Sequence, residues 1–142
     1  MAEVLNIAVE AKDESVDRLI HAGLRAFNRT RADWPERQYF NVTLRNTDGQ
    51  VRGAILASVN FDVLVLEDVF IDEDCRAGGH GARMMAVAEH EGCARGARLA
   101  VVSTFSWQAR PFYEKCGYSV YAELPYNNGV YTLFSLKKSL CA

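Results

Sequence analysis

The chain has 142 residues, of which 49% are hydrophobic, and carries a formal net charge of −2. This size and hydrophobicity fit one domain with its own core, so we expect residues 1–142 to form a single domain. The nearly balanced charge argues against a general nucleic-acid binder, which needs an excess of Lys and Arg.

Targeting and metal-binding signals are not visible in the sequence. No apolar run approaches the roughly 20 residues that a membrane span needs, and the first residues do not resemble a signal peptide. His21 and His90 have no partners at metal-ligand spacing, so we expect no metal site. The cysteines form no Cys-x-x-Cys pair, and we expect reduced thiols in a cytoplasmic protein. They are Cys75, Cys93, Cys116 and Cys141.

Hydrophobic periodicity predicts a chain of alternating strands and helices. The segments expected to form strands are 4–10, 40–44, 51–61, 63–71, 97–104, 118–124 and 130–136. The segments expected to form helices follow Asp13 to about residue 30, then cover about 81–93 and 106–116. Meander and crossover connections in one chain predict an α/β (α+β) fold with a mixed sheet and helices on its faces.

The segment 63–71 is almost continuously apolar and is broken only by Glu67 and Asp68. A strand that is buried on both faces has this pattern. A buried carboxylate is costly unless it is paired or protonated, and burial raises its pKa toward the range of a useful base. Alternation along a strand would place the two side chains on opposite faces, so we expect only one of them to act as a base.

A glycine-rich turn, Arg76-Ala77-Gly78-Gly79-His80-Gly81-Ala82, joins that strand to the next helix. Glycines allow a tight turn and a close approach of the backbone to a ligand. The first N–H groups of a helix have no intrahelical partner and lie at its positive end, so they suit a phosphate or pyrophosphate. The Walker Gly-Lys-Ser/Thr motif is absent, and the spacing differs from the dinucleotide fingerprint.

The spacing Arg76-x-x-Gly79-x-Gly81 closely resembles the coenzyme A signature of the GNAT acyltransferase superfamily. The segment Phe112-Tyr113-Glu114-Lys115-Cys116-Gly117-Tyr118 resembles the closing motif of that family. The resemblance covers most of the chain. It implies a mixed, mostly antiparallel sheet of about seven strands with helices on both faces, and transfer of an acetyl group from acetyl-CoA to an amine in a ternary complex.

The resemblance also implies roles for individual residues. Tyr113 would protonate the departing thiolate, and Glu67 would remove the proton of the amine, although Asp68 or water are alternatives. Ser106 stands where many members carry a cofactor-binding asparagine, and it is also a plausible helix cap. The expected cofactor-binding residues are Val69, Phe70, Ile71, Arg76, Ala77, Gly78, Gly79, His80, Gly81, Ala82, Ser106, Ala109 and Phe112.

The acceptor is the least defined part of the interpretation. Family members build the acceptor pocket from the first helix, the loop after it and late strands. The candidates are therefore Phe27, Asn28, Arg29, Arg31, Trp34 and Tyr126. A small-molecule or peptide amine is expected, and a homodimer is one option that the sequence leaves open. The alternative function is a non-catalytic CoA-binding sensor or interaction module on the same fold.

Overall fold

The computed structural model describes residues 2–141, which divide into two compact units between Trp34 and Pro35. The first unit contains the helix α1 (Glu14–Arg29), which begins after Asp13. The side chain of Asp13 accepts a hydrogen bond from the N–H of Ser15 at 2.8 Å, as expected of an N-cap. The apolar residues of α1 are exposed within this unit. None of the described helices is long and apolar enough to cross a bilayer.

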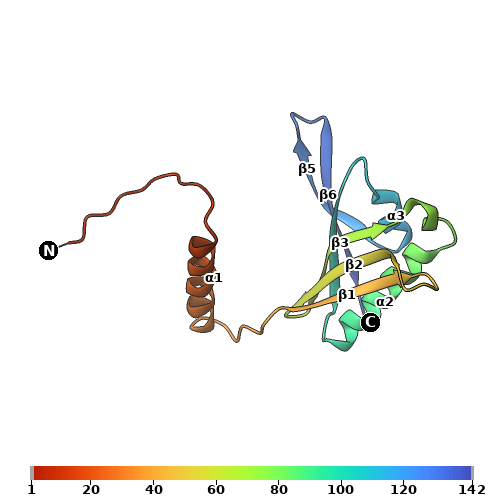
Figure 1. The fold of residues 1–142 in the computed structure, drawn as a ribbon, viewed down its shortest axis with the longest axis horizontal. Coiled ribbons are helices and arrows are strands. Elements are labelled where there is room, and N and C mark those ends of the chain that lie inside the picture. The colour runs from red at the N-terminus through yellow and green to blue at the C-terminus, as the bar shows by residue number, and fades with distance from the viewer. Residues whose placement is uncertain (1, 142) are drawn as a thin grey trace. The chain divides into compact units, whose positions relative to one another are not determined.

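The second unit is built on a sheet whose strands lie in the order β1-β2-β3-β4-β6-β5 (Figure 1). All neighbouring strands are antiparallel except β3 and β4, which are parallel and are connected through a helix. The α/β class and the mixed, mostly antiparallel sheet are therefore confirmed. The strands are β1 (Gln38–Arg45), β2 (Val51–Asn60), β3 (Val63–Ile71), β4 (Leu99–Phe105), β5 (Ser119–Tyr126) and β6 (Tyr131–Ser139).

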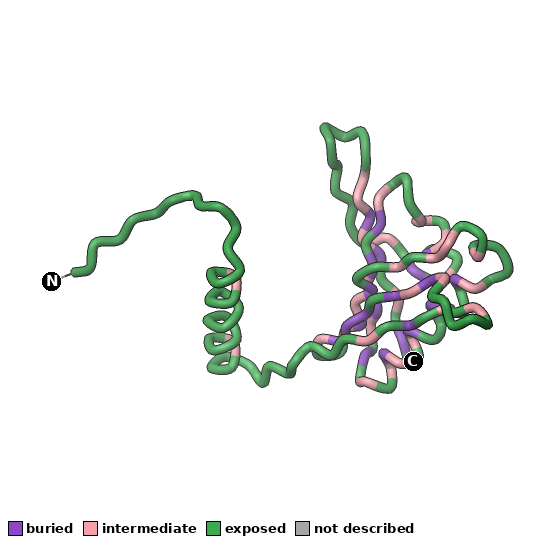
Figure 2. The backbone as a smooth tube through the Cα atoms, in the orientation of Figure 1, coloured by how far each residue is buried: buried purple, intermediate pink, exposed green. Residues whose placement is uncertain are grey.

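Two α-helices and one short 3-10 helix complete the second unit: α2 (His80–Ala94), α3 (Arg110–Lys115) and η1 (Glu73–Cys75). Met84, Met85 and Ala88 of α2 and Tyr113 of α3 join one hydrophobic core with the inward side chains of the strands. The buried residues concentrate in the centre of the sheet (Figure 2). This core holds α2 and α3 against the sheet.

The expected turns have the required backbone conformations. Gly49 adopts a φ of 82° in the β1–β2 hairpin, where the side chain of Asn46 accepts hydrogen bonds from Asp48 N and Gln50 N. Asn127, Asn128 and Gly129 all have positive φ in the β5–β6 hairpin. These conformations suit asparagine and glycine, which explains why the sequence located both hairpins.

The expected first strand, 4–10, is wrong. These residues form no strand and are exposed, so the sheet has six strands among the described residues instead of about seven. The segment alternates only loosely. Alternation alone does not make a strand without a neighbour to accept its backbone hydrogen bonds.

The cysteines also differ from the expectation of reduced thiols. A disulfide joins Cys93, in the last turn of α2, to Cys141 at the C-terminal end, across a sequence separation of 48. Cys75 and Cys116 are free. The end of β6 returns beside this turn, where Leu140 N donates to Arg98 O at 2.8 Å. Only the tertiary fold creates this proximity, so spacing along the sequence could not reveal it.

Candidate functional site

The strands β3 and β4 pair along only part of their lengths. Their parallel ladder joins 63–66 to 99–102, and within the described sheet residues 67–71 and 103–105 are not paired with one another. The two strands thus diverge at their carboxyl ends and leave an open backbone edge on each side. An unpaired edge of this kind can receive hydrogen bonds from an extended ligand.

A β-bulge in β3 lies where the strands begin to diverge. Asp68 pairs with Leu56 and Leu66 pairs with Ala57, which leaves Glu67 as the extra residue. The inward positions are Leu64 and Leu66 before the bulge but Val69 and Ile71 after it. This change in the alternation leaves both carboxylates exposed. The prediction of a strand buried on both faces is therefore wrong, and so is the prediction that Glu67 and Asp68 lie on opposite faces.

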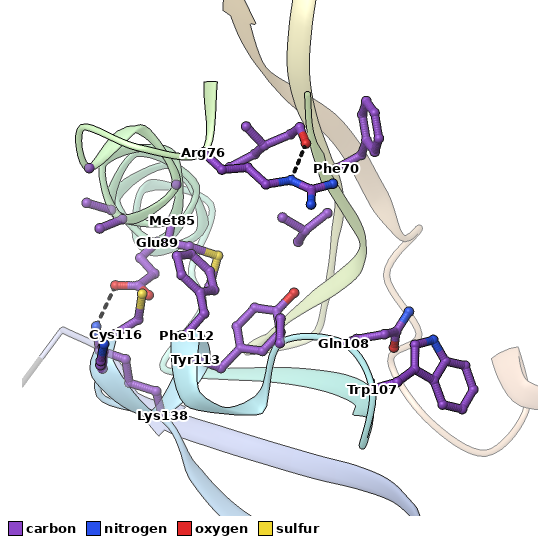
Figure 3. Close-up of a pocket in the computed structure, with 18 residues that line it drawn as sticks. Phe70, Arg76, Met85, Glu89, Trp107, Gln108, Phe112, Tyr113, Cys116 and Lys138 are labelled. Carbon is purple, nitrogen blue, oxygen red and sulfur yellow. Dashed lines mark hydrogen bonds and ion pairs between the residues drawn. The ribbon is translucent and has the colours of Figure 1, made fainter. Parts of the chain in front are cut away.

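A cavity of about 750 Å³ opens between the end of β3, the start of α2 and helix α3 (Figure 3). Nine of the residues expected to bind the cofactor line this cavity. They are Val69, Phe70, Ile71, Arg76, Gly79, Gly81, Ala82, Ala109 and Phe112. The structure therefore gathers the two sequence motifs, which lie about 30 residues apart in the chain, around one space.

The glycine turn supplies the mouth of this cavity with N–H donors. Gly78 and Gly79 have φ values of 92° and 78°, which L side chains rarely adopt. Gly79 is the N-cap of α2 and has no side chain to cap the helix. The first turn of α2, as the structure describes it, contains no acidic residue. The positive end of the α2 dipole is thus left available to an anion.

Arg76 is fixed beside this turn. Its Nε donates to the carbonyl oxygen of Ile71 at 3.0 Å, which holds the side chain along the end of β3 (Figure 3). Arg83 takes a different position, with Nη2 at 2.6 Å from Nδ1 of His80 on the same helical turn. Arg76 lines the cavity, and so it adds a positive charge where the α2 N–H groups converge.

Gly81 allows α2 and α3 to approach each other at the cavity. A Cβ atom on Gly81 would lie 2.9 Å from Cε1 of Phe112 and 3.0 Å from Cδ1 of Ile71. The Phe112 ring therefore packs over the start of α2 and also forms part of the cavity wall. This glycine is needed for a close contact between elements, whereas Gly78 and Gly79 are needed for the backbone turn.

Tyr113 lies on α3 with its ring in the core and its hydroxyl directed into the cavity (Figure 3). Only 6% of the residue is exposed. Burial raises the pKa of Tyr113 to about 12, with a smaller contribution from Cys116. The phenol is protonated at neutral pH, and its hydroxyl can donate a hydrogen bond to a group in the cavity.

Glu67 belongs to a hydrogen-bonded group at a second, smaller cavity of about 130 Å³. Its Oε1 accepts a hydrogen bond from the hydroxyl of Ser58 at 2.8 Å and lies 3.5 Å from Nη1 of Arg37. Ser58 is fully buried, while the side chain of Glu67 is 30% exposed. Glu67 is therefore a held, solvent-accessible carboxylate and not the buried one that the apolar strand suggested.

The two cavities share part of their walls. Val69, Gln108, Ala109 and Tyr113 line both of them. The smaller cavity adds Glu67, Asp68 and the polar side chains of Ser103 and Thr104. The two cavities are therefore neighbours, and Tyr113 is part of the wall that they share.

Some expected site residues lie elsewhere. Ser106 does not cap α3, which begins at Arg110 with Ala109 as its N-cap. Ser106 Oγ instead accepts a hydrogen bond from Thr132 N at 3.2 Å, and Ser106 N donates to Thr132 O at 2.9 Å. Phe27, Asn28 and Trp34 belong to the first unit, and their assignment to acceptor binding stays a prediction.

Sequence reasoning missed a polar cluster on the α2 side of the larger cavity. Glu89 accepts hydrogen bonds from the Tyr118 hydroxyl at 2.8 Å and from Nζ of Lys138 at 2.7 Å. Burial and the bond to Glu89 raise the pKa of Tyr118, and burial raises that of Cys116. These residues come from α2, the α3–β5 connection and β6. No local pattern in the sequence could have joined them.

The chain is similar to a known protein family. The model of the acetyltransferase (GNAT) family matches residues 5–118. The chain is 27% identical over 121 residues to "Acetyltransferase Atu2258" of Agrobacterium fabrum (strain C58 / ATCC 33970), a match that covers 84% of this chain and 88% of that protein.

Solved structures agree with the family match. An acetyltransferase structure from Agrobacterium tumefaciens superimposes with a TM-score of 0.82 at 26% identity, covering 99% of this chain and all of that one. An aminoglycoside 6'-N-acetyltransferase complexed with coenzyme A has a TM-score of 0.65 at 20% identity, covering 76% of this chain and 75% of that one. The chain therefore belongs to the acetyltransferase (GNAT) family.

Proposed function

We propose that this protein transfers the acetyl group of acetyl-CoA to an amine by direct attack, with residues 1–142 forming one catalytic domain. The observation that carries the proposal is that the two cavities share Tyr113 as a wall residue. One cavity has the features of an acetyl-CoA site, and the other has carboxylates suited to an ammonium group. The family match spans residues of both compact units, which supports a single functional domain.

The residues of the larger cavity fit coenzyme A along its length. The N–H groups at the start of α2, together with Arg76, would bind the pyrophosphate. The open edge of β3 at 69–71 would pair with the extended pantetheine arm through backbone groups. Acetyl-CoA supplies an activated acyl group on a thiol leaving group. The chain's residues position that group and manage the protons.

The proton transfers assign different tasks to the two cavities. Glu67, held by Ser58 and Arg37, attracts the ammonium form of the acceptor and accepts its proton, directly or through water. The free amine nitrogen then forms a bond to the acetyl carbon and releases its second proton to water, while the carbon–sulfur bond breaks. Tyr113, which is protonated at neutral pH, donates a hydrogen bond to the departing sulfur, passes its proton to it and regains a proton from water.

The test is release of the CoA thiol from acetyl-CoA across a panel of primary amines. Wild type is expected to release thiol with at least one amine and to yield the acetylated product. Tyr113→Phe should lower kcat about 100-fold while the Kd for acetyl-CoA stays within twofold, since the ring and its packing remain. The proposed role of Tyr113 would be contradicted by an unchanged kcat.

Tyr118→Phe is the matched control. Tyr118 is also a buried tyrosine with a raised pKa, but its hydroxyl is bonded to Glu89. Its loss should leave the chemical step nearly unchanged. Saturable acetyl-CoA binding with no acetylated product from any amine would instead support the sensor or interaction module.

A further inference from the structure

An exposed group of aromatic rings beside the site has no role in the chemistry described above. It consists of Phe105 at the end of β4, Trp107 in the loop after it, and Tyr126 and Tyr131 at the tip of the β5–β6 hairpin; we call these four residues the aromatic patch. Trp107 is 59% exposed, and the two tyrosines are 41% and 40% exposed. Large aromatic surfaces that face water commonly mark binding sites.

The rings of the aromatic patch are ordered with respect to one another. Phe105 and Trp107 stack with centroids 4.6 Å apart and an interplanar angle of 7°. Tyr126 contacts Phe105 edge-on at 5.0 Å, and Tyr131 contacts Trp107 edge-on at 4.7 Å. These are the geometries that aromatic pairs favour, and a further ring can extend such an array.

The backbone beneath the aromatic patch is held in place from both sides. The two hydrogen bonds between Ser106 and Thr132 join the Trp107 loop to β6. Tyr126 and Tyr131 are direct partners in the β5–β6 ladder. The rings are thus presented on a fixed surface, which lowers the entropy cost of binding a ligand to them.

The aromatic patch borders the point where the two cavities meet. Trp107 lines the larger cavity, and the adjacent Gln108 lines both (Figure 3). Oε1 of Gln108 accepts a hydrogen bond from the N–H of Phe105 at 2.7 Å, which ties the patch to this shared wall. An acceptor whose amine lies near Glu67 and Tyr113 can therefore extend along the wall toward the patch.

The cationic side chains that lie over aromatic rings are found outside the aromatic patch. Within residues 2–141, cationic side chains lie over five other rings, including Arg110 over Phe134 at 4.4 Å and Lys137 over Tyr121 at 5.8 Å. Both of these cations lie over rings of the β5–β6 hairpin. The faces of the patch rings are thus not covered by a cationic side chain of residues 2–141, and the ring of a ligand can stack on them.

We propose that the aromatic patch selects the acceptor, and that the preferred acceptor is a primary amine that carries an aromatic ring on a short flexible linker. The ammonium group is drawn to the carboxylates of the smaller cavity, and the ring stacks on the exposed face of the patch. This inference rests on the proposed acetyl transfer and specifies the substrate class of that site.

The test compares three amines: 2-phenylethylamine, 2-cyclohexylethylamine and 1,4-diaminobutane. Equilibrium binding to the CoA-saturated protein is measured by calorimetry, and KM and kcat are measured with acetyl-CoA. 2-Phenylethylamine should have a Kd and a KM about fivefold lower than those of the saturated analogue, and lower still than those of the diamine. Equal affinity for the two ring compounds would overturn the proposal, as would a preference for the diamine.

Variants locate the preference on the aromatic patch. Trp107→Ala should raise the KM for 2-phenylethylamine about tenfold with little change in kcat, and Trp107→Phe should restore most of the affinity. Tyr126→Ala, at the exposed hairpin tip, should weaken binding about threefold even if the Trp107 variant fails to fold. Tyr121→Ala is the matched control, since Tyr121 is 54% exposed on the same hairpin but outside the patch. A ring preference that survives both patch variants would overturn the proposal.

The binding measurement also separates this proposal from the proposed function. If no amine is acetylated but the CoA-saturated protein still prefers 2-phenylethylamine, acetyl transfer fails and the recognition surface stands. If amines are acetylated without regard to the ring, acetyl transfer stands and the recognition proposal fails.

Discussion

The two cavities that meet at Tyr113 are built in different ways. The larger one is lined by two local motifs, the glycine turn and the α3 segment. Each motif contains residue types that a backbone turn, a close contact between helices or the expected ligand requires. The smaller one exists because β3 contains a bulge and separates from β4. We therefore expect the larger cavity, which we call the motif-built cavity, to tolerate few substitutions in its motifs. In the smaller cavity we expect only a few polar side chains to matter.

The largest expected effect concerns the smaller cavity. Glu67→Gln should lower kcat/KM about 100-fold at neutral pH, because the amide cannot accept the amine proton. Ser58 and Arg37 remain to hold the side chain, so the fold and the Kd for acetyl-CoA should not change. Steady-state kinetics with varied amine concentration at saturating acetyl-CoA measure the effect.

Asp68→Asn is the matched change at the neighbouring position, and we expect less than a threefold effect from it. If Asp68→Asn is the more damaging variant, the base lies on the other residue of the bulge. If neither variant lowers the rate, solvent accepts the proton, and the difference in task between the two cavities disappears.

The next effect concerns the motif-built cavity. Gly81→Leu should raise the Kd for CoA by at least 30-fold, because even a Cβ at this position lies within 3.0 Å of Phe112 and Ile71. Calorimetry measures the affinity, and circular dichroism shows whether the variant is folded. Val87→Leu, at an exposed position on the same helix, is the control and should bind normally. Normal binding by the folded Gly81 variant would contradict the assignment of this cavity to CoA.

A smaller loss is expected from Arg76→Ala. Removing one charge beside the α2 N–H groups should raise the Kd for CoA about tenfold, and the difference from wild type should shrink as salt screens the interaction. Arg95→Ala, beyond the opposite end of α2, removes the same charge and should have no effect on binding. A salt-independent loss would show that Arg76 acts through its bond to Ile71 and not through its charge.

The smallest effect is a pH dependence of stability. The pKa of Tyr113 is raised by burial from 10.0 to about 12, so the folded state holds this proton more tightly than the unfolded state. The associated stability is fully present below pH 10 and is lost as the pH rises from 10 to 12. Urea unfolding measures the free energy of unfolding at pH 9 and at pH 11. Its decrease between these two pH values should be about 1 kcal/mol smaller in Tyr113→Phe than in wild type. Equal falls in both proteins would contradict the burial of this hydroxyl.

The parts that the sequence predicted are those with local physical causes. Gly49, Gly79 and Asn127 occupy conformations that other residues rarely adopt, so their positions located turns correctly. Helix α1 followed from the spacing of its apolar residues and the Asp13 cap. The family resemblance then connected the glycine turn to Tyr113 over a distance that no local rule covers.

The parts that the sequence did not predict depend on tertiary pairing. The bulge at Glu67 is a property of the register between β2 and β3. A regular strand with the same sequence would bury at least one of the two carboxylates. Ser106 had the sequence features of a helix cap, but it bonds to β6. The Cys93–Cys141 disulfide joins elements 48 residues apart.

The most direct test of the central claim is a ternary measurement at the junction of the two cavities. Wild-type protein is mixed in a single turnover with acetyl-CoA, labelled at the acetyl carbonyl, and 2-phenylethylamine, and the products are followed by mass spectrometry. We expect the label to pass directly to the amine nitrogen, with no acetylated protein at any time point. Label that appears first on the protein, for example on Cys75 or Cys116, would contradict direct attack at Tyr113.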